Sequence, residues 1–170
     1  MITETSDKKE LLAAIEEAVN NYQDLLASLD DNNINSIPYP GSWTAGQLVQ
    51  HVTKSIGFIT KAMQAPSKAA ERNPGEKIAH LKNIFLDFSK KMNSPDFIFP
   101  DEGPYTKQIS SNGLNEAFAQ FKESANNANL NDIVDGLPFG PTTKLEILHF
   151  VLYHTQRHLQ QMKNICAAIA

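Results

Sequence analysis

The sequence predicts an all-α fold, a four-helix bundle with an additional short helix, formed by one domain spanning residues 1–170. Apolar residues recur at helical spacing in five separate stretches, whereas period-two runs typical of strands are scarce. Loops rich in Pro, Gly and Asn separate these stretches. A chain of 170 residues is long enough to bury a sizeable core without disulfides.

The first helix is indicated by apolar residues that follow alternating steps of four and three, which places them on one face. These residues are Leu11, Ile15, Ala18, Tyr22, Leu25 and Leu29. Ser6 or Asp7 can cap the start of this helix. Its apolar stripe is narrow and heptad-like, and such a seam can serve a homodimer as well as a core.

A second helix is expected from about Thr44 to Met63, ended by Pro66, and a shorter third helix is expected after the sequence NPGE. The second has the apolar stripe Leu48, Val52, Ile56, Ile59 and Met63. The third has the stripe Ile78, Leu81, Phe85, Phe88 and Met92. The proline-rich sequence NSPDFIFPDEGPYTKQIS then predicts an irregular segment.

A fourth helix is predicted to start at Ser111 or Asn112, and a last helix near Thr142 or Thr143. The last helix has a capping-box pattern, because Glu146 follows Thr143 by three residues. About a dozen residues separate the two helices, so we expect them to be neighbours in space.

Composition narrows the classes of function. The formal charge is −4, and no Lys/Arg block with interleaved aromatic residues is present, which argues against nucleic-acid binding. No apolar run is long enough to span a bilayer, so no membrane partner is expected. The N-terminal residues do not resemble a signal peptide, and the single cysteine, Cys166, fits a reducing compartment. These features favour a cytoplasmic location.

Three of the five histidines lie in the sequence HFVLYHTQRHLQQM. At about 100° per residue, His154 and His158 are neighbours at the edge of the core-facing stripe of the last helix. By the same geometry His149 lies about half a turn around the helix from His158, among polar residues, and we expect it at the surface. His80, in the short helix, is also expected at the surface.

Histidines at positions i and i+4 of a helix can bind one metal ion together. His51 lies at the edge of the apolar stripe of the second helix, so three imidazoles can converge if the second and last helices are neighbours. Two simpler interpretations stay open. His154 and His158 can be spaced by chance, and His51 can be a hydrogen-bonded histidine at the core boundary. Trp43 is expected to pack over one end of the bundle.

The sequence SWTAGQLVQH, from Ser42 to His51, resembles the start of the second helix in the DinB-like superfamily, where the pattern W-[ST]-x-x-[QED]-[IVL]-x-x-H supplies a metal ligand. The sequence GPTTKLEILHFVLYHTQRHLQQM resembles the family's last helix, where an H-x-x-x-H pair supplies two more ligands and a Gln often follows two residues later, as Gln160 does here. The resemblance implies a DinB-like bundle in which His51, His154 and His158 bind a divalent metal, zinc or nickel above others.

Three neutral imidazoles leave at least one coordination position for water or substrate, as in catalytic metal sites. We therefore expect a metal-dependent hydrolase or a thiol-dependent S-transferase acting on a small molecule. Some members of the resembled family use a low-molecular-weight thiol, which is a cofactor implied here by that resemblance. The alternative is a non-catalytic metal-binding or interaction bundle. The sequence selects no general acid or base, although Ser55, one turn after His51, can face the same site.

Overall fold

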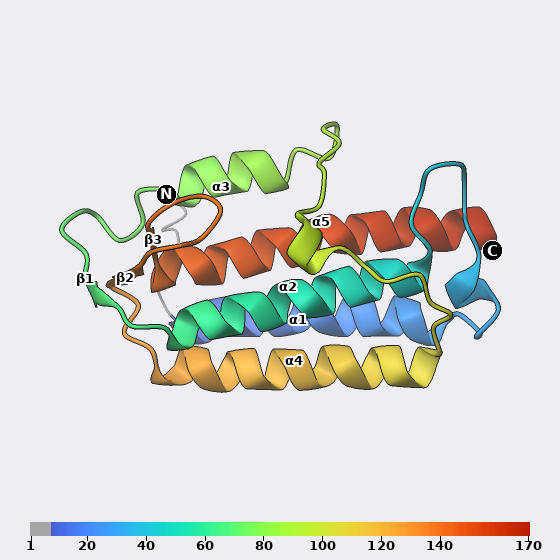
Figure 1. The fold of residues 1–170 in the computed structure, drawn as a ribbon, viewed down its shortest axis with the longest axis horizontal. Coiled ribbons are helices and arrows are strands. Elements are labelled where there is room, and N and C mark those ends of the chain that lie inside the picture. Colours follow the sequence, from blue (N-terminus) through green and yellow to red (C-terminus); the bar gives the residue numbers. More distant parts are fainter. Residues whose placement is uncertain (1–7) are drawn as a thin grey trace.

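A computed structural model describes residues 8–170, so the predicted caps Ser6 and Asp7 lie outside the described residues. Four long helices form a bundle, and a shorter helix lies against it (Figure 1). The long helices are α1 (Lys8–Ala27), α2 (Ala45–Gln64), α4 (Lys107–Asn127) and α5 (Lys144–Ile169), and the short one is α3 (Ile78–Phe85). The predicted all-helical bundle with an additional short helix is confirmed.

The long helices pack as a ring in which α5 contacts α1 and α2, and α4 contacts α2 and α1. In Figure 1, α1 and α5 run in one direction while α2 and α4 run in the other. The expectation that the fourth and last helices are neighbours is wrong, because α4 and α5 occupy opposite corners of this ring. The second and last helices are neighbours instead, which is the arrangement that the histidine hypothesis requires.

The connection from α2 to α4 spans residues 65–106 and determines the surroundings of α5. Since α2 and α4 are parallel neighbours, this connection must return along the length of the bundle (Figure 1). It contains α3, which packs on α5, and a 3-10 turn, η2 (Asp96–Ile98), which packs on α2. The chain therefore lays an extra layer across the seam between α2 and α5.

Helix starts follow local hydrogen-bonding rules. Capping boxes join Thr44 to Gln47 at the start of α2 and Thr143 to Glu146 at the start of α5, as the sequence predicts for the latter. In contrast, α4 begins at Lys107, a turn earlier than expected. The Lys107 backbone N–H donates to Asp31 Oδ1 at 2.8 Å, a long-range bond that sequence spacing does not show.

The short helix is shorter than its apolar pattern predicts. It ends at Phe85, and the side chains of Phe88 and Met92 are 53% and 43% exposed instead of buried. Both residues lie in the irregular part of the 65–106 connection. Both side chains line the cavity beside the histidines.

A small antiparallel sheet, absent from the sequence-based expectation, closes one end of the bundle. Its strands are β1 (Lys68–Ala69), β2 (Asp132–Val134) and β3 (Thr142–Thr143), in the order β1-β2-β3. Lys68 pairs with Ile133, which in turn pairs with Thr143. Strands of two or three residues are too short to show period-two alternation.

The core lies between the four long helices. It includes most residues of the predicted apolar faces, together with residues outside those faces, such as Leu12, Val19 and Leu26 of α1. Its largest fully buried side chains include Ile15, Tyr22, Leu48, Leu114, Phe121 and Leu148. Within residues 8–170, no helix combines the length and the apolar character needed to cross a membrane. Burial is unusually complete at the start of α5, where residues 142–155 are all buried.

Candidate metal centre

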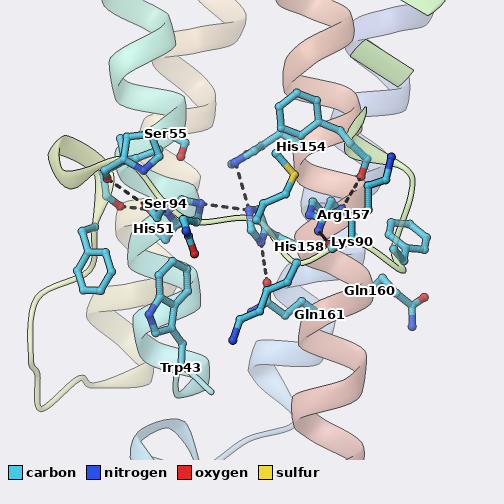
Figure 2. Close-up of a pocket in the computed structure, with 18 of the residues that line it drawn as sticks. Trp43, His51, Ser55, Lys90, Ser94, His154, Arg157, His158, Gln160 and Gln161 are labelled. Carbon is cyan, nitrogen blue, oxygen red and sulfur yellow. Dashed lines mark hydrogen bonds between the residues drawn. The ribbon is translucent and has the colours of Figure 1, made fainter. Parts of the chain in front are cut away.

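Three histidines meet between α2 and α5. His51 comes from α2, and His154 and His158 come from successive turns of α5 (Figure 2). His158 Nε2 lies 3.1 Å from His51 Nε2 and 3.1 Å from His154 Nε2. One nitrogen from each ring lies within 4.8 Å of the others. The structure thus brings together the three residues that the sequence predicts as ligands.

Two backbone and side-chain acceptors orient these rings. The Nδ1–H of His51 donates to the Ile98 carbonyl at 3.0 Å, and the Nδ1–H of His158 donates to Gln161 Oε1 at 2.9 Å. A carbonyl oxygen can only accept, so the proton of each neutral ring is on Nδ1. Each Nε2 therefore carries a lone pair that points toward the centre of the cluster.

Two lone pairs cannot form a hydrogen bond with each other, yet His51 Nε2 and His158 Nε2 face one another at 3.1 Å. A cation between them removes this conflict. For tetrahedral zinc with Zn–N bonds of about 2.0–2.1 Å, ligand nitrogens lie roughly 3.3 Å apart, close to the separations seen here. The donor set and its geometry fit a divalent ion of the kind that imidazole binds.

The electrostatics also favour neutral rings. The imidazoles of His51, His154 and His158 are 3%, 7% and 8% exposed. Burial lowers the pKa of His51, despite its bond to Ile98. Burial and then the proximity of His51 lower the pKa of His158 to about 3, against the opposing bond to Gln161. Burial, followed by the neighbouring His158, holds the pKa of His154 well below its ordinary value. All three rings are neutral at neutral pH, as metal ligands must be.

Aromatic rings hold the cluster from the sides. Trp43, just before α2, packs tilted against His51 with ring centroids 5.0 Å apart. Phe150 packs against His154 at 5.2 Å, and Phe85 contacts the same ring edge-on at 5.9 Å. These contacts limit the rotation of the imidazoles. Trp43 is therefore part of the histidine site, in addition to packing near one end of α2.

The 65–106 connection is attached to this cluster at several points. Ile98 in η2 provides the carbonyl that orients His51, and Ser94 Oγ lies 3.3 Å from His51 Nδ1. From α5, Arg157 donates to the carbonyls of Phe85 and Asp87 at 3.3 and 3.0 Å, and also to the carbonyl of Lys90. The irregular segment thereby becomes one wall of the site (Figure 2).

A cavity of about 840 Å³ opens beside the histidines. Its wall includes all three imidazoles, so the cluster is accessible from the cavity in spite of its burial. Most of the remaining wall comes from aromatic side chains, from residues 88–95 and 97–99 of the connection, and from Arg157, Gln160, Gln161 and Asn164 of α5. The cavity therefore leaves room for a small molecule beside the three histidines.

Two other histidines, His80 and His149, are expected at the surface, and only one of these two predictions is confirmed. His80 is exposed, as predicted. The surface prediction for His149 is wrong: its side chain is 4% exposed, and its Nδ1 lies 3.2 Å from Tyr153 Oη. The physical reason is that α1, α2 and α3 all pack on α5, so the polar face of its first half is covered as well.

Sequence reasoning missed the residues that orient the cluster. Gln161 follows His158 by three residues, so helical spacing could have identified it. Gln160, which matches the family pattern, donates instead to Asn164 at 3.1 Å, although it lies on the cavity wall. Ser55 is buried and on the cavity wall, and its Oγ has no hydrogen-bond partner within the described residues. No sequence signal identifies the Ile98 carbonyl, because every residue has one.

Comparison with known proteins agrees with this architecture. Residues 14–162 match the DinB superfamily, and the chain belongs to that family. A crystal structure of a conserved protein from Enterococcus faecalis is similar, with a TM-score of 0.68 and 17% sequence identity, and the match covers 97% of this chain and 98% of the other. That likeness supports the fold alone. No curated protein matches the chain.

Proposed function

We propose that His51, His154 and His158 bind one divalent metal ion, zinc or nickel, and that the protein is a metal-dependent enzyme acting on a small molecule. The observation that carries the proposal is the convergence of the three Nε2 atoms, with two rings fixed by bonds from Nδ1. Metal-binding histidines typically donate from their other ring nitrogen to a carbonyl, a carboxylate or water in this way. The adjoining cavity favours catalysis over a purely structural metal site.

Of the two reactions considered, thiol-dependent S-transfer fits the cavity better than hydrolysis. A bound divalent ion would supply Lewis acidity and lower the pKa of a water or thiol at its open position. Zinc hydrolases commonly add a side-chain carboxylate as general base. No Asp or Glu is found among the described residues that line the cavity. A thiol, with an ordinary pKa of about 8.5, depends less on such a base than water with a pKa of about 15.7.

The metal half of the proposal is tested by titrating zinc or nickel into untagged, metal-stripped protein. We expect one ion per chain and an increase in melting temperature, since a ligand that binds only the folded state stabilises it. His51→Ala should remove both effects, whereas His80→Ala, which changes an exposed histidine of α3, should keep them. Equal metal uptake by the two variants would contradict the assignment.

The reaction is tested by following thiol consumption with a panel of low-molecular-weight thiols and electrophilic small molecules. The metal-loaded protein is expected to accelerate consumption for at least one pair, and the His51→Ala variant is not. Ester and amide hydrolysis measured on the same samples provides the comparison. Hydrolysis without thiol transfer would favour the second reaction, and metal-loaded protein inert in both assays would favour a non-catalytic metal-binding bundle.

A further inference from the structure

The charge of the cavity wall has one sign. Lys90, Lys91 and Arg157 line it, whereas no Asp or Glu does so within the described part of the chain. Lys90 is paired with Asp87 at 3.3 Å, so Lys91 and Arg157 supply the charge that no ion pair between described residues offsets. The whole chain, in contrast, carries 19 acidic and 15 basic residues. A cavity enriched in positive charge in a protein of net charge −4 concentrates anions.

Arg157 places part of this charge beside the histidines. Its guanidinium donates to the carbonyls of Phe85, Asp87 and Lys90, which are neutral acceptors. None of the ion pairs formed between described residues includes Arg157. The three neutral imidazoles add no negative charge. A metal ion bound there would therefore share the site with an arginine whose charge has no directly paired carboxylate.

The rest of the wall is apolar and aromatic. Phe58, Phe85, Phe139 and Phe150 line the cavity together with Trp43. At its edge the side chains of Tyr39, Phe88, Met92, Phe97 and Phe99 are each 43–53% exposed. These five are most of the large apolar side chains that the described residues leave exposed. Exposed apolar residues gathered at one place mark a binding site more often than isolated ones do.

We infer that the cavity binds an organic anion with an aromatic-sized apolar body, a carboxylate whose charged group lies at the histidine and Arg157 end. The apolar body then contacts the phenylalanines of the wall. The volume of about 840 Å³ is ample for such a molecule. This inference rests on the proposed function, because the metal ion contributes to the attraction of the carboxylate, and it specifies the class of substrate.

The test compares three probes by isothermal titration calorimetry of the zinc-loaded protein: 4-phenylbenzoate, 4-phenylbenzamide and acetate. The benzoate has both the charge and the apolar body, and each other probe lacks one of them. We expect the benzoate to bind at least about tenfold more tightly than either, the ratio that one charge-assisted contact or one buried ring can supply. An amide or an acetate that binds as tightly as the benzoate overturns the inference.

Variants then locate the charge effect. Arg157→Gln and Lys91→Gln should each reduce the benzoate-to-amide affinity ratio severalfold, and Arg157→Lys should keep more of it than Arg157→Gln. Lys163→Gln is the matched control, since Lys163 is an exposed cation of α5 that does not line the cavity. An unchanged ratio in both Arg157→Gln and Lys91→Gln would also overturn the inference.

Measuring the zinc content of the same samples separates the two proposals. Protein that takes up no zinc contradicts the proposed function. Protein that holds one zinc per chain, yet does not prefer the benzoate over the amide, contradicts only the inferred substrate class.

Discussion

Hydrogen bonds from Nδ1 of His51 and His158 determine which nitrogen of each ring can bind a metal ion. A free imidazole can carry its proton on either nitrogen, and it binds a metal only through the unprotonated one. The Ile98 carbonyl and Gln161 Oε1 decide this for His51 and His158 by accepting from Nδ1. The lone pairs are then aimed at a common point before any ion arrives, which lowers the cost of ordering the ligands on binding.

Replacing Gln161 tests this orienting role. Gln161→Leu removes the acceptor of the 2.9 Å bond from His158 while leaving all three histidines in place. We expect a roughly 10–100-fold loss of zinc affinity, as is usual for such partners. Competition with a chelator of known affinity measures it.

Gln160→Leu is the matched control for this substitution. Gln160 lies next to Gln161 and also borders the cavity, but its amide bonds to Asn164. Its replacement should leave zinc affinity unchanged. Similar losses in the two variants would mean that the Gln161 bond has no special role.

The packing of α2 against Tyr105 depends on a glycine in the first turn of the helix. A Cβ atom built on Gly46 would lie 2.6 Å from Cγ and 2.7 Å from Cβ of Tyr105, the inflexible part of that side chain. Tyr105 also donates from its hydroxyl to Gln50 Oε1 at 2.9 Å. The close approach of Tyr105 to Gly46 fixes the end of the 65–106 connection against α2.

Two glycine-to-alanine substitutions in this helix should therefore change the free energy of unfolding in opposite directions. Gly46→Ala is expected to lower the free energy of unfolding by about 1–3 kcal/mol, because the Tyr105 ring has to move. Gly57→Ala should raise it by up to about 1 kcal/mol, because nothing lies within 4 Å of the added Cβ and alanine favours the helix. Urea unfolding measures both. A gain in stability for both variants would contradict the packing described here.

The start of α5 depends on a buried carboxylate. Glu146 is fully buried and accepts from Arg72 at 2.7 Å and from the backbone N–H groups of Lys77 and Thr143. Burial by itself raises the pKa of Glu146, but the bonds from Arg72 and the two backbone groups outweigh it and hold the pKa below the ordinary 4.5.

This pKa predicts how stability depends on pH. Since the folded state lowers the pKa of Glu146, its contribution is fully present above pH 4.5 and is lost as pH falls through the lower folded pKa. Urea unfolding between pH 6 and 3 should show a steeper loss for the wild type than for Glu146→Gln. Glu116→Gln, which changes an exposed carboxylate of α4, should follow the wild type. A wild-type curve parallel to that of Glu146→Gln would contradict this account.

For the fold of the whole chain, the sequence predicts the positions of the helices better than it predicts which segments cover each helix. Helical periodicity identified the five helices of residues 8–170, and the predicted faces of α1 and α2 are buried apart from the half-buried Leu25. The histidine cluster could be predicted because His51, His154 and His158 each lie at the edge of an apolar stripe. His149 was misplaced because a helical wheel assumes one covered face, whereas α5 is covered on several sides.

What the sequence could not predict depends on contacts between distant segments. The 65–106 connection has no periodicity of its own beyond α3, yet it provides the Ile98 carbonyl and much of the cavity wall. Its course follows from the parallel arrangement of α2 and α4, which forces it back across the bundle (Figure 1). The homodimer suggested by the narrow stripe of α1 stays a prediction, which light scattering after size exclusion can test.

The proposed function depends on three imidazoles that bind one metal ion and leave a coordination position open. X-ray absorption spectroscopy of the untagged, zinc-loaded protein tests it most directly. We expect three histidine nitrogens at about 2.0–2.1 Å, at least one further light-atom ligand and no sulfur in the coordination shell. Fewer than three imidazoles, or a sulfur ligand from Cys166, would contradict it.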